Sequence, residues 1–97
     1  MIELSPLAAA QVAGLEDHYA RLERSEAIRN LALALVEAAD TIERQPETGL
    51  LSPRPYPQLA KPGRLWLHKR RYWIAYSLTP IRIVAVFYDA ANIPKRI

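Results

Sequence analysis

The chain has 97 residues, of which 51 % are hydrophobic and 24 % charged; this fits one small globular domain over residues 1–97 and argues against a disordered protein. It contains no cysteine, which excludes disulfides, cysteine-rich zinc sites and thiol nucleophiles. The net charge of +3 is unevenly distributed, because residues 1–49 carry four Lys/Arg and nine Asp/Glu whereas residues 50–97 carry nine and one. We therefore expect the basic half to face nucleic acid or an acidic protein segment, unless the two halves neutralise each other within the fold.

The first half of the chain predicts a short strand at residues 2–4 and then two helices. Ser5-Pro6 is a typical helix start, because the serine hydroxyl accepts a bond from a free amide and proline at the first helical position loses no needed donor. The apolar stripe of this helix is Leu7, Ala8, Val12, Leu15, Tyr19 and Leu22. Ser25 is the N-cap candidate of the second helix, whose stripe is Ile28, Leu31, Leu35, Ala38 and Ile42 and which Pro46 ends. With a short link, the two helices should pack as an antiparallel hairpin.

The second half predicts a loop followed by a sheet. Residues 45–63 hold five prolines and two glycines, which excludes helix interiors and central strands. Runs rich in β-forming residues follow at 64–69, 72–78 and 81–88, joined by the polar turn Lys69-Arg70-Arg71 and by Thr79-Pro80. They predict an antiparallel meander. The fold class is then α+β in the order β-α-α-β-β-β, with a helical hairpin packed on a small, mainly antiparallel curved sheet.

The sheet face that points away from the helices is predicted to be an exposed hydrophobic surface. Both faces of the middle run are apolar, with Tyr72, Ile74 and Tyr76 alternating with Trp73 and Ala75. One face should meet the helices. The other face needs a cover, and we expect a partner to supply it.

The sequence shows no sign of a membrane protein or of a bound cofactor. The first residues lack a basic segment leading into an apolar run, and no apolar run approaches the roughly 20 residues of a bilayer span. A cytoplasmic protein without membrane contact is expected. His18 and His68 are far apart in the chain with no third group to orient them, so neither a metal site nor an acid–base pair is expected from them.

Five short motifs follow one another along the chain. They are Leu4-Ser5-Pro6-Leu7-Ala8, Pro46-Glu47-Thr48-Gly49, Arg64-Leu65, Arg71-Tyr72-Trp73-Ile74-Ala75-Tyr76 and Ile81-Arg82-Ile83-Val84-Ala85-Val86. Their order and spacing resemble the ParE-like branch of the ParE/RelE toxin superfamily of type II toxin–antitoxin systems, which serve in growth arrest and plasmid stabilisation. The resemblance implies a toxin that binds DNA gyrase, traps its cleaved DNA complex and is neutralised by an antitoxin whose disordered segment folds over it. We expect this segment to lie across the helical hairpin and the sheet, with acidic residues meeting Arg64, Arg71 or Arg82.

The chain departs from the nuclease members of this superfamily. The RelE-type ribosome-dependent ribonucleases have an arginine on the third strand, where Trp73 stands here, and basic and phenolic groups after the last strand, where Asp89-Ala90-Ala91-Asn92 stand here. A tryptophan cannot offset the charge that develops on a scissile phosphate. The resemblance therefore favours a gyrase inhibitor over an enzyme. Tyr88 stands near the position of a histidine found in many ParE-type members.

The candidate antitoxin- or target-binding residues form a predicted basic and aromatic patch, because arginine pairs with carboxylates and stacks on aromatic rings. They are Arg64, Trp66, Lys69, Arg70, Arg71, Trp73, Arg82 and Tyr88. Two alternatives remain open: an mRNA endoribonuclease that acts on the ribosome through Lys69, Arg71 and Arg82, and a degenerate member that binds antitoxin without toxicity. Alanine at residues 69–71 should weaken toxicity or antitoxin affinity more than alanine at Arg21 and Arg24.

Overall fold

The computed structural model describes residues 2–54, 56–91 and 93–96, and its fold is α+β, as predicted. In chain order the elements are β1 (Glu3–Leu4), α1 (Pro6–Arg21), α2 (Ser25–Arg44), the 3-10 turn η1 (Pro57–Leu59), β2 (Arg64–Lys69), β3 (Tyr72–Leu78), β4 (Ile81–Tyr88) and α3 (Ile93–Arg96). The predicted bounds of the runs that form β2, β3 and β4 are confirmed. The short helix α3 was not predicted.

The two long helices begin differently. At α1 the amide of Ala8 donates to Ser5 Oγ over 3.1 Å, as the serine–proline start predicted. The prediction that Ser25 caps α2 is wrong, because Arg24 occupies the N-cap position and makes no side-chain capping bond. The residues that join α1 to α2 bond instead to the end of α1, because the amides of Glu23 and Arg24 donate to the carbonyls of Ala20 and Tyr19 at 3.0 and 2.9 Å.

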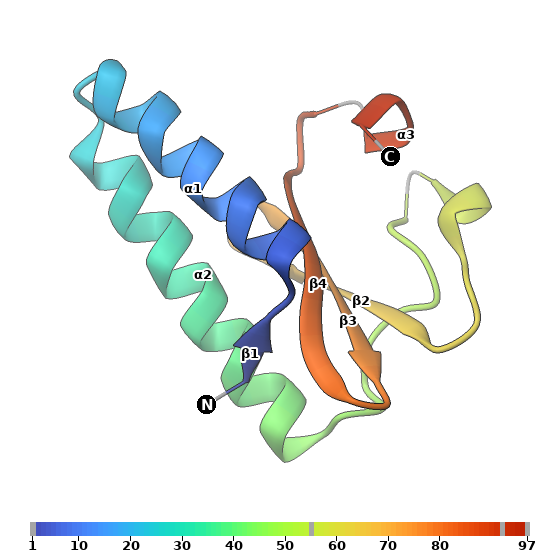
Figure 1. Cartoon of the computed structure of the whole chain (residues 1–97). Helices are drawn as coiled ribbons and strands as arrows, with labels where there is room; N and C mark the ends of the chain where they lie inside the picture. The colour runs from blue at the N-terminus through green and yellow to red at the C-terminus, as the bar shows by residue number, and fades with distance from the viewer. Residues whose placement is uncertain (1, 55, 92, 97) are drawn as a thin grey trace.

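The strands form a mixed, open sheet in the order β1-β4-β3-β2. The antiparallel meander of β2, β3 and β4 is confirmed. β1 pairs with β4 in parallel, because the hairpin of α1 and α2 carries the chain across one face of the sheet before the meander begins. In Figure 1 this hairpin covers one side of the sheet, and residues 50–54 and 56–62 lie with α3 on the other side.

The main core lies between the helical hairpin and the sheet. Its fully buried members include Leu31, Ala34, Ala38 and Ile42 of α2 and Ile74, Tyr76, Ile83 and Val86 of the sheet. The alanines on α2 allow the helix to approach closely, which explains why the predicted apolar stripe packs against the strands.

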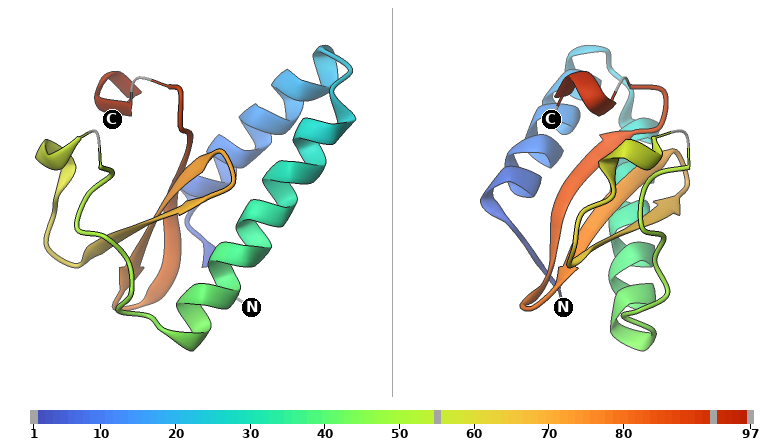
Figure 2. Two further views of the ribbon diagram at one scale, coloured as in Figure 1. Left: turned by 180° about the vertical axis from the view of Figure 1, so that it is seen from behind. Right: turned by 90° about the vertical axis from the view of Figure 1, so that its right-hand side faces the viewer.

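A second core covers the opposite face of the sheet, and here the sequence prediction is wrong. Trp66, Trp73, Ala75, Ala85, Phe87 and Ile93 are buried together, with Tyr56 and Leu59 packed against them. Figure 2 shows the sheet between the helical hairpin on one side and, on the other, η1 and α3, which come from two separate parts of the chain. The chain therefore supplies its own cover, because the proline-rich loop and the short last helix place apolar side chains over the aromatic face.

The start of the proline-rich loop is tied to the sheet by two sets of contacts. Leu50 exchanges two backbone hydrogen bonds of 2.7 Å with Trp66 at the edge of β2. The hydroxyl of Tyr76 donates to the Pro46 carbonyl over 2.7 Å and accepts from the Gly49 amide over 3.0 Å. Within the residues that the structure describes, no helix has both the length and the apolar character needed to cross a bilayer.

Candidate functional site

An open groove of about 1110 Å³ lies between the free end of the helical hairpin and the end of β4. In Figures 1 and 2 the hairpin leans away from the sheet at the α1–α2 link, which leaves this side of the molecule open. One wall comes from α1 and includes Leu7, which is 61 % exposed, and Leu15. The start of α2 and residues 86–91 form the other walls. The volume exceeds that of most small-molecule pockets, so the groove suits a polypeptide segment.

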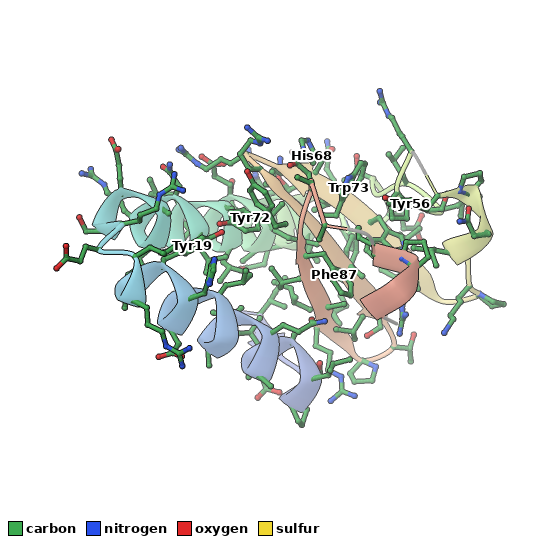
Figure 3. The ribbon with its side chains drawn as sticks, turned by 90° about the horizontal axis from the view of Figure 1, so that it is seen from above. Tyr19, Tyr56, His68, Tyr72, Trp73 and Phe87 are labelled. Atoms are coloured by element: carbon green, nitrogen blue, oxygen red, sulfur yellow. The ribbon has the colours of Figure 1, made fainter. Side chains whose placement is uncertain are left out.

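A pair of buried tyrosines belongs to the lining of the groove. The hydroxyl groups of Tyr19 on α1 and Tyr72 on β3 are 2.6 Å apart in a buried hydrogen bond, and Figure 3 shows the two side chains pointing toward each other between helix and sheet. Burial raises the pKa of Tyr72 well above its ordinary value, and the hydrogen bond with Tyr19 raises it further. Tyr72 is therefore neutral at physiological pH, and its bond to Tyr19 links α1 to β3.

The rim of the groove carries more positive than negative charge. Arg24 at the start of α2 and Arg71 just before β3 line it with the Glu26 carboxylate, and Arg71, which also pairs with Asp89, keeps a largely exposed side chain. The Arg71 guanidinium lies 5.4 Å from the centre of the Tyr88 ring, within cation–π range. The groove thus combines an apolar and aromatic floor with basic groups at its edge, and an acidic amphipathic peptide would complement both.

The predicted basic turn is partly neutralised by the fold. Arg70 pairs with Glu37 of α2 over 3.0 Å, and Arg71 Nε contacts both carboxylate oxygens of Asp89 at 3.3 and 3.2 Å. Asp89 Oδ2 is also hydrogen-bonded to His68 Nε2 over 3.1 Å. The end of β4 is therefore held to the β2–β3 turn by one carboxylate between a histidine and an arginine.

The structure does not bring the predicted site residues into one patch. Arg64 and Arg82 lie on either side of Ser77, whereas Lys69 is opposite Tyr72 at the other end of the strands. Arg64 and Lys69 are five positions apart along β2, a distance of about 17 Å. The basic groups thus form two separate clusters, and Lys69, Arg71 and Arg82 do not converge as the nuclease alternative required.

The two tryptophans of the predicted patch are also not exposed for binding, contrary to the prediction from the sequence. Trp66 is fully buried and Trp73 is 6 % exposed, because η1 and α3 pack over them. Of the candidate residues, Arg71 and Tyr88 line the groove, while Lys69 and Arg70 stay on the turn beside it. The open surface that Arg71 and Tyr88 share therefore faces the helical hairpin rather than the far side of the sheet.

Sequence reasoning missed Asp89 and the partner that it gives to His68. Asp89 is the one carboxylate in residues 50–97, and it follows the last strand opposite the arginine turn, which was the available signal. His18 and His68 lie apart, with His18 in the groove and His68 beside the opposite face of the sheet. Among the described residues no cluster of His, Asp and Glu side chains could hold a metal ion.

Comparisons with models of known protein families and with curated proteins gave no match. The case for a function therefore rests on the sequence motifs, the fold and the groove.

Proposed function

We propose that this protein is the toxin of a type II toxin–antitoxin pair, of the ParE-like kind, and that it inhibits DNA gyrase without being an enzyme. Two observations support the proposal. The chain has the β-α-α-β-β-β order and the helical hairpin on a curved sheet that the motif resemblance implies. It also has an open groove that no part of the described chain fills.

The groove is the observation that carries the proposal. The second face of the sheet cannot be the surface that a partner must shield, because the chain covers it. The groove instead leaves Leu7 and Leu15 partly exposed next to Tyr72 and Tyr88, and it has Arg24 and Arg71 at its rim. An antitoxin segment that folds on binding would bury the apolar wall and place its carboxylates on the arginines.

The antitoxin-binding role of the groove is tested with paired substitutions. Leu7→Glu and Arg71→Glu each place a carboxylate in the groove and should reduce co-purification with the antitoxin by about tenfold or more. Val36→Glu is the matched control for the leucine, because Val36 is 52 % exposed and lies outside the groove. Arg29→Glu is the matched control for the arginine. Equal binding of all four variants would remove the groove from the proposal. Arg24 is unsuitable as a control, since it lines the groove.

The cellular target is tested by expression of the chain in bacteria. A gyrase inhibitor should arrest growth and induce the SOS response while messenger RNA stays intact, and co-expression of the antitoxin should restore growth. Cleavage of messenger RNA within minutes would contradict the gyrase proposal. Normal growth with retained antitoxin binding would identify the chain as a non-toxic member.

One arrangement favours the ribonuclease as a second candidate, through residues other than those the sequence indicated. His68 has Asp89 to orient it, and the Arg71 guanidinium contacts the same carboxylate. A histidine oriented by a carboxylate next to a cation is a plausible acid–base group for phosphodiester cleavage. The discriminating variants are His68→Ala and His18→Ala. If the chain is a nuclease, the former should abolish RNA cleavage and the latter should not.

A further inference from the structure

A smaller hollow of about 370 Å³ lies on the other side of the molecule, between residues 48–54 and strands β2 and β3. Its lining combines an apolar floor with a few polar groups, the arrangement typical of small-ligand sites. The residues that matter are Thr48, Leu50, Arg54, Trp66, His68 and Trp73. In Figure 3, Trp73 and His68 lie next to each other on this side of the sheet, away from Tyr19 and Tyr72.

The lining is chemically asymmetric. It contains the Arg54 guanidinium, the His68 imidazole and the Thr48 hydroxyl, and it contains no carboxylate. Asp89, the carboxylate that His68 contacts, is also engaged by Arg71. Arg54 makes no ion pair within the described part of the chain, so its charge is available to a ligand.

Trp66 adds a second, independent observation. Its indole Nε1 is buried and has no hydrogen-bond partner among the described residues. A buried donor without an acceptor destabilises the protein, so the packing beside the hollow is not fully satisfied.

We propose that this hollow is a binding site for a small aromatic carboxylate. The carboxylate pairs with the planar guanidinium of Arg54, which matches its two oxygens, and the ring packs against Trp73 and Leu50. The volume is near the lower end of the range for ligand pockets, so it fits one ring or two fused rings better than a nucleotide. The site is separate from the groove, and it stands or falls independently of the proposed toxin function.

The chain offers a direct readout, because its two tryptophans both line the hollow. Protein labelled with 5-fluorotryptophan should therefore give two fluorine NMR signals, one from Trp66 and one from Trp73. Titration with benzoate should shift both signals and reach saturation. Benzamide, which has the ring without the charge, and acetate, which has the charge without the ring, should each bind at least tenfold more weakly.

Two arginine variants locate the binding site. Arg54→Ala should weaken benzoate binding by about tenfold, since it removes a charge-assisted hydrogen bond. Arg29→Ala, on the exposed side of α2, should leave it unchanged, and the fluorine spectrum of each free variant reports whether the fold is intact. The proposal is overturned if benzoate produces no saturable shift or if Arg54→Ala binds as well as the parent. Tighter binding of adenosine monophosphate than of benzoate would overturn the ligand class.

Discussion

The Tyr76 hydroxyl fixes the chain where it leaves α2. It bonds to both the Pro46 carbonyl and the Gly49 amide, and it is fully buried beneath them. A Cβ added at Gly49 would lie 2.7 Å from Tyr76 Oη and 2.8 Å from Leu65 Cβ. The motif Pro46-Glu47-Thr48-Gly49 and the last tyrosine of the β3 motif are therefore two halves of one structural contact.

Removal of this hydroxyl should destabilise the protein. Tyr76→Phe leaves the Gly49 amide and the Pro46 carbonyl without their partner, and we expect the free energy of unfolding to fall by about 1–3 kcal/mol in urea titrations. Tyr56→Phe is the control, because that residue is half-buried and its hydroxyl has no hydrogen bond among the described residues. Equal stability of the two variants would show that the contact contributes nothing.

The glycine side of the same contact gives a complementary test. Gly49→Ala should also destabilise, whereas Gly14→Ala, with open space around its Cβ in α1, should stabilise by about 0.5–1 kcal/mol. In the double variant Tyr76→Phe with Gly49→Ala, the clash with Oη is gone while that with Leu65 remains. The two effects should therefore be less than additive.

Tyr72 predicts how stability changes at alkaline pH. The pKa of its hydroxyl is raised in the folded protein, chiefly by burial, from an unfolded value near 10. The contribution of this raised pKa to the free energy of unfolding is fully present below pH 10. As the pH rises above 10 the unfolded state loses this proton first, so the free energy of unfolding should decrease.

The measurement is chemical unfolding of the parent and of Tyr72→Phe between pH 8 and pH 11. The variant should show a shallower decline above pH 10. Tyr76 contributes to the remaining slope in the same direction, because burial also raises its pKa. Parallel curves for parent and variant would mean that Tyr72 ionises as easily in the fold as in the unfolded chain.

At the scale of elements, the short link between α1 and α2 holds Glu23 in a backbone conformation that is unfavourable for a non-glycine residue. Glu23 has a positive φ of 55° and its amide, with that of Arg24, bonds back to the last turn of α1. This left-handed position usually carries glycine. The link sets the free end of the hairpin, and hence one wall of the groove.

A glycine in this link should stabilise the hairpin. Glu23→Gly relieves the left-handed strain and should raise the free energy of unfolding by about 1 kcal/mol in thermal or urea melts. Glu16→Gly, at an exposed position inside α1, should lower it by a similar amount, because glycine is a poor helix residue. The same sign for both substitutions would contradict this account of the link.

At the scale of the whole molecule, the sheet is stabilised from two sides by parts of one chain. The helical hairpin covers one face, and residues 50–60 with α3 cover the other. Ile93 is the member of α3 that is fully buried against Trp66 and Phe87. The chain end therefore contributes to the second core.

Loss of this contact should loosen the aromatic face. Ile93→Ala should lower the free energy of unfolding by about 2–4 kcal/mol, because it leaves a cavity in a packed core. Tryptophan emission should shift to the red at urea concentrations below the main transition, since the second core holds both tryptophans. Ile81→Ala is the control, because Ile81 is 44 % exposed. An unchanged emission profile for Ile93→Ala would show that α3 does not cover the face.

Local chemistry and periodicity in the sequence determined the elements and their order. Ser5-Pro6 set the start of α1, Pro46 limited α2, and the alternation around Thr79-Pro80 and the arginine turn set the bounds of β2, β3 and β4. Each of these sequence patterns lies within a few residues of the element boundary that it specifies, so it can be recognised without the tertiary structure.

Only the tertiary structure decided which surfaces are free. Strand register placed Arg82 at the opposite end of the sheet from Arg71, and the return of the chain after β4 placed Asp89 beside His68. The proline-rich loop and Ile93 buried the tryptophans that composition alone had left exposed. Such outcomes depend on contacts between residues far apart in sequence, which no local pattern records, and they removed the far face of the sheet from the candidate binding surface and left the groove beside the hairpin.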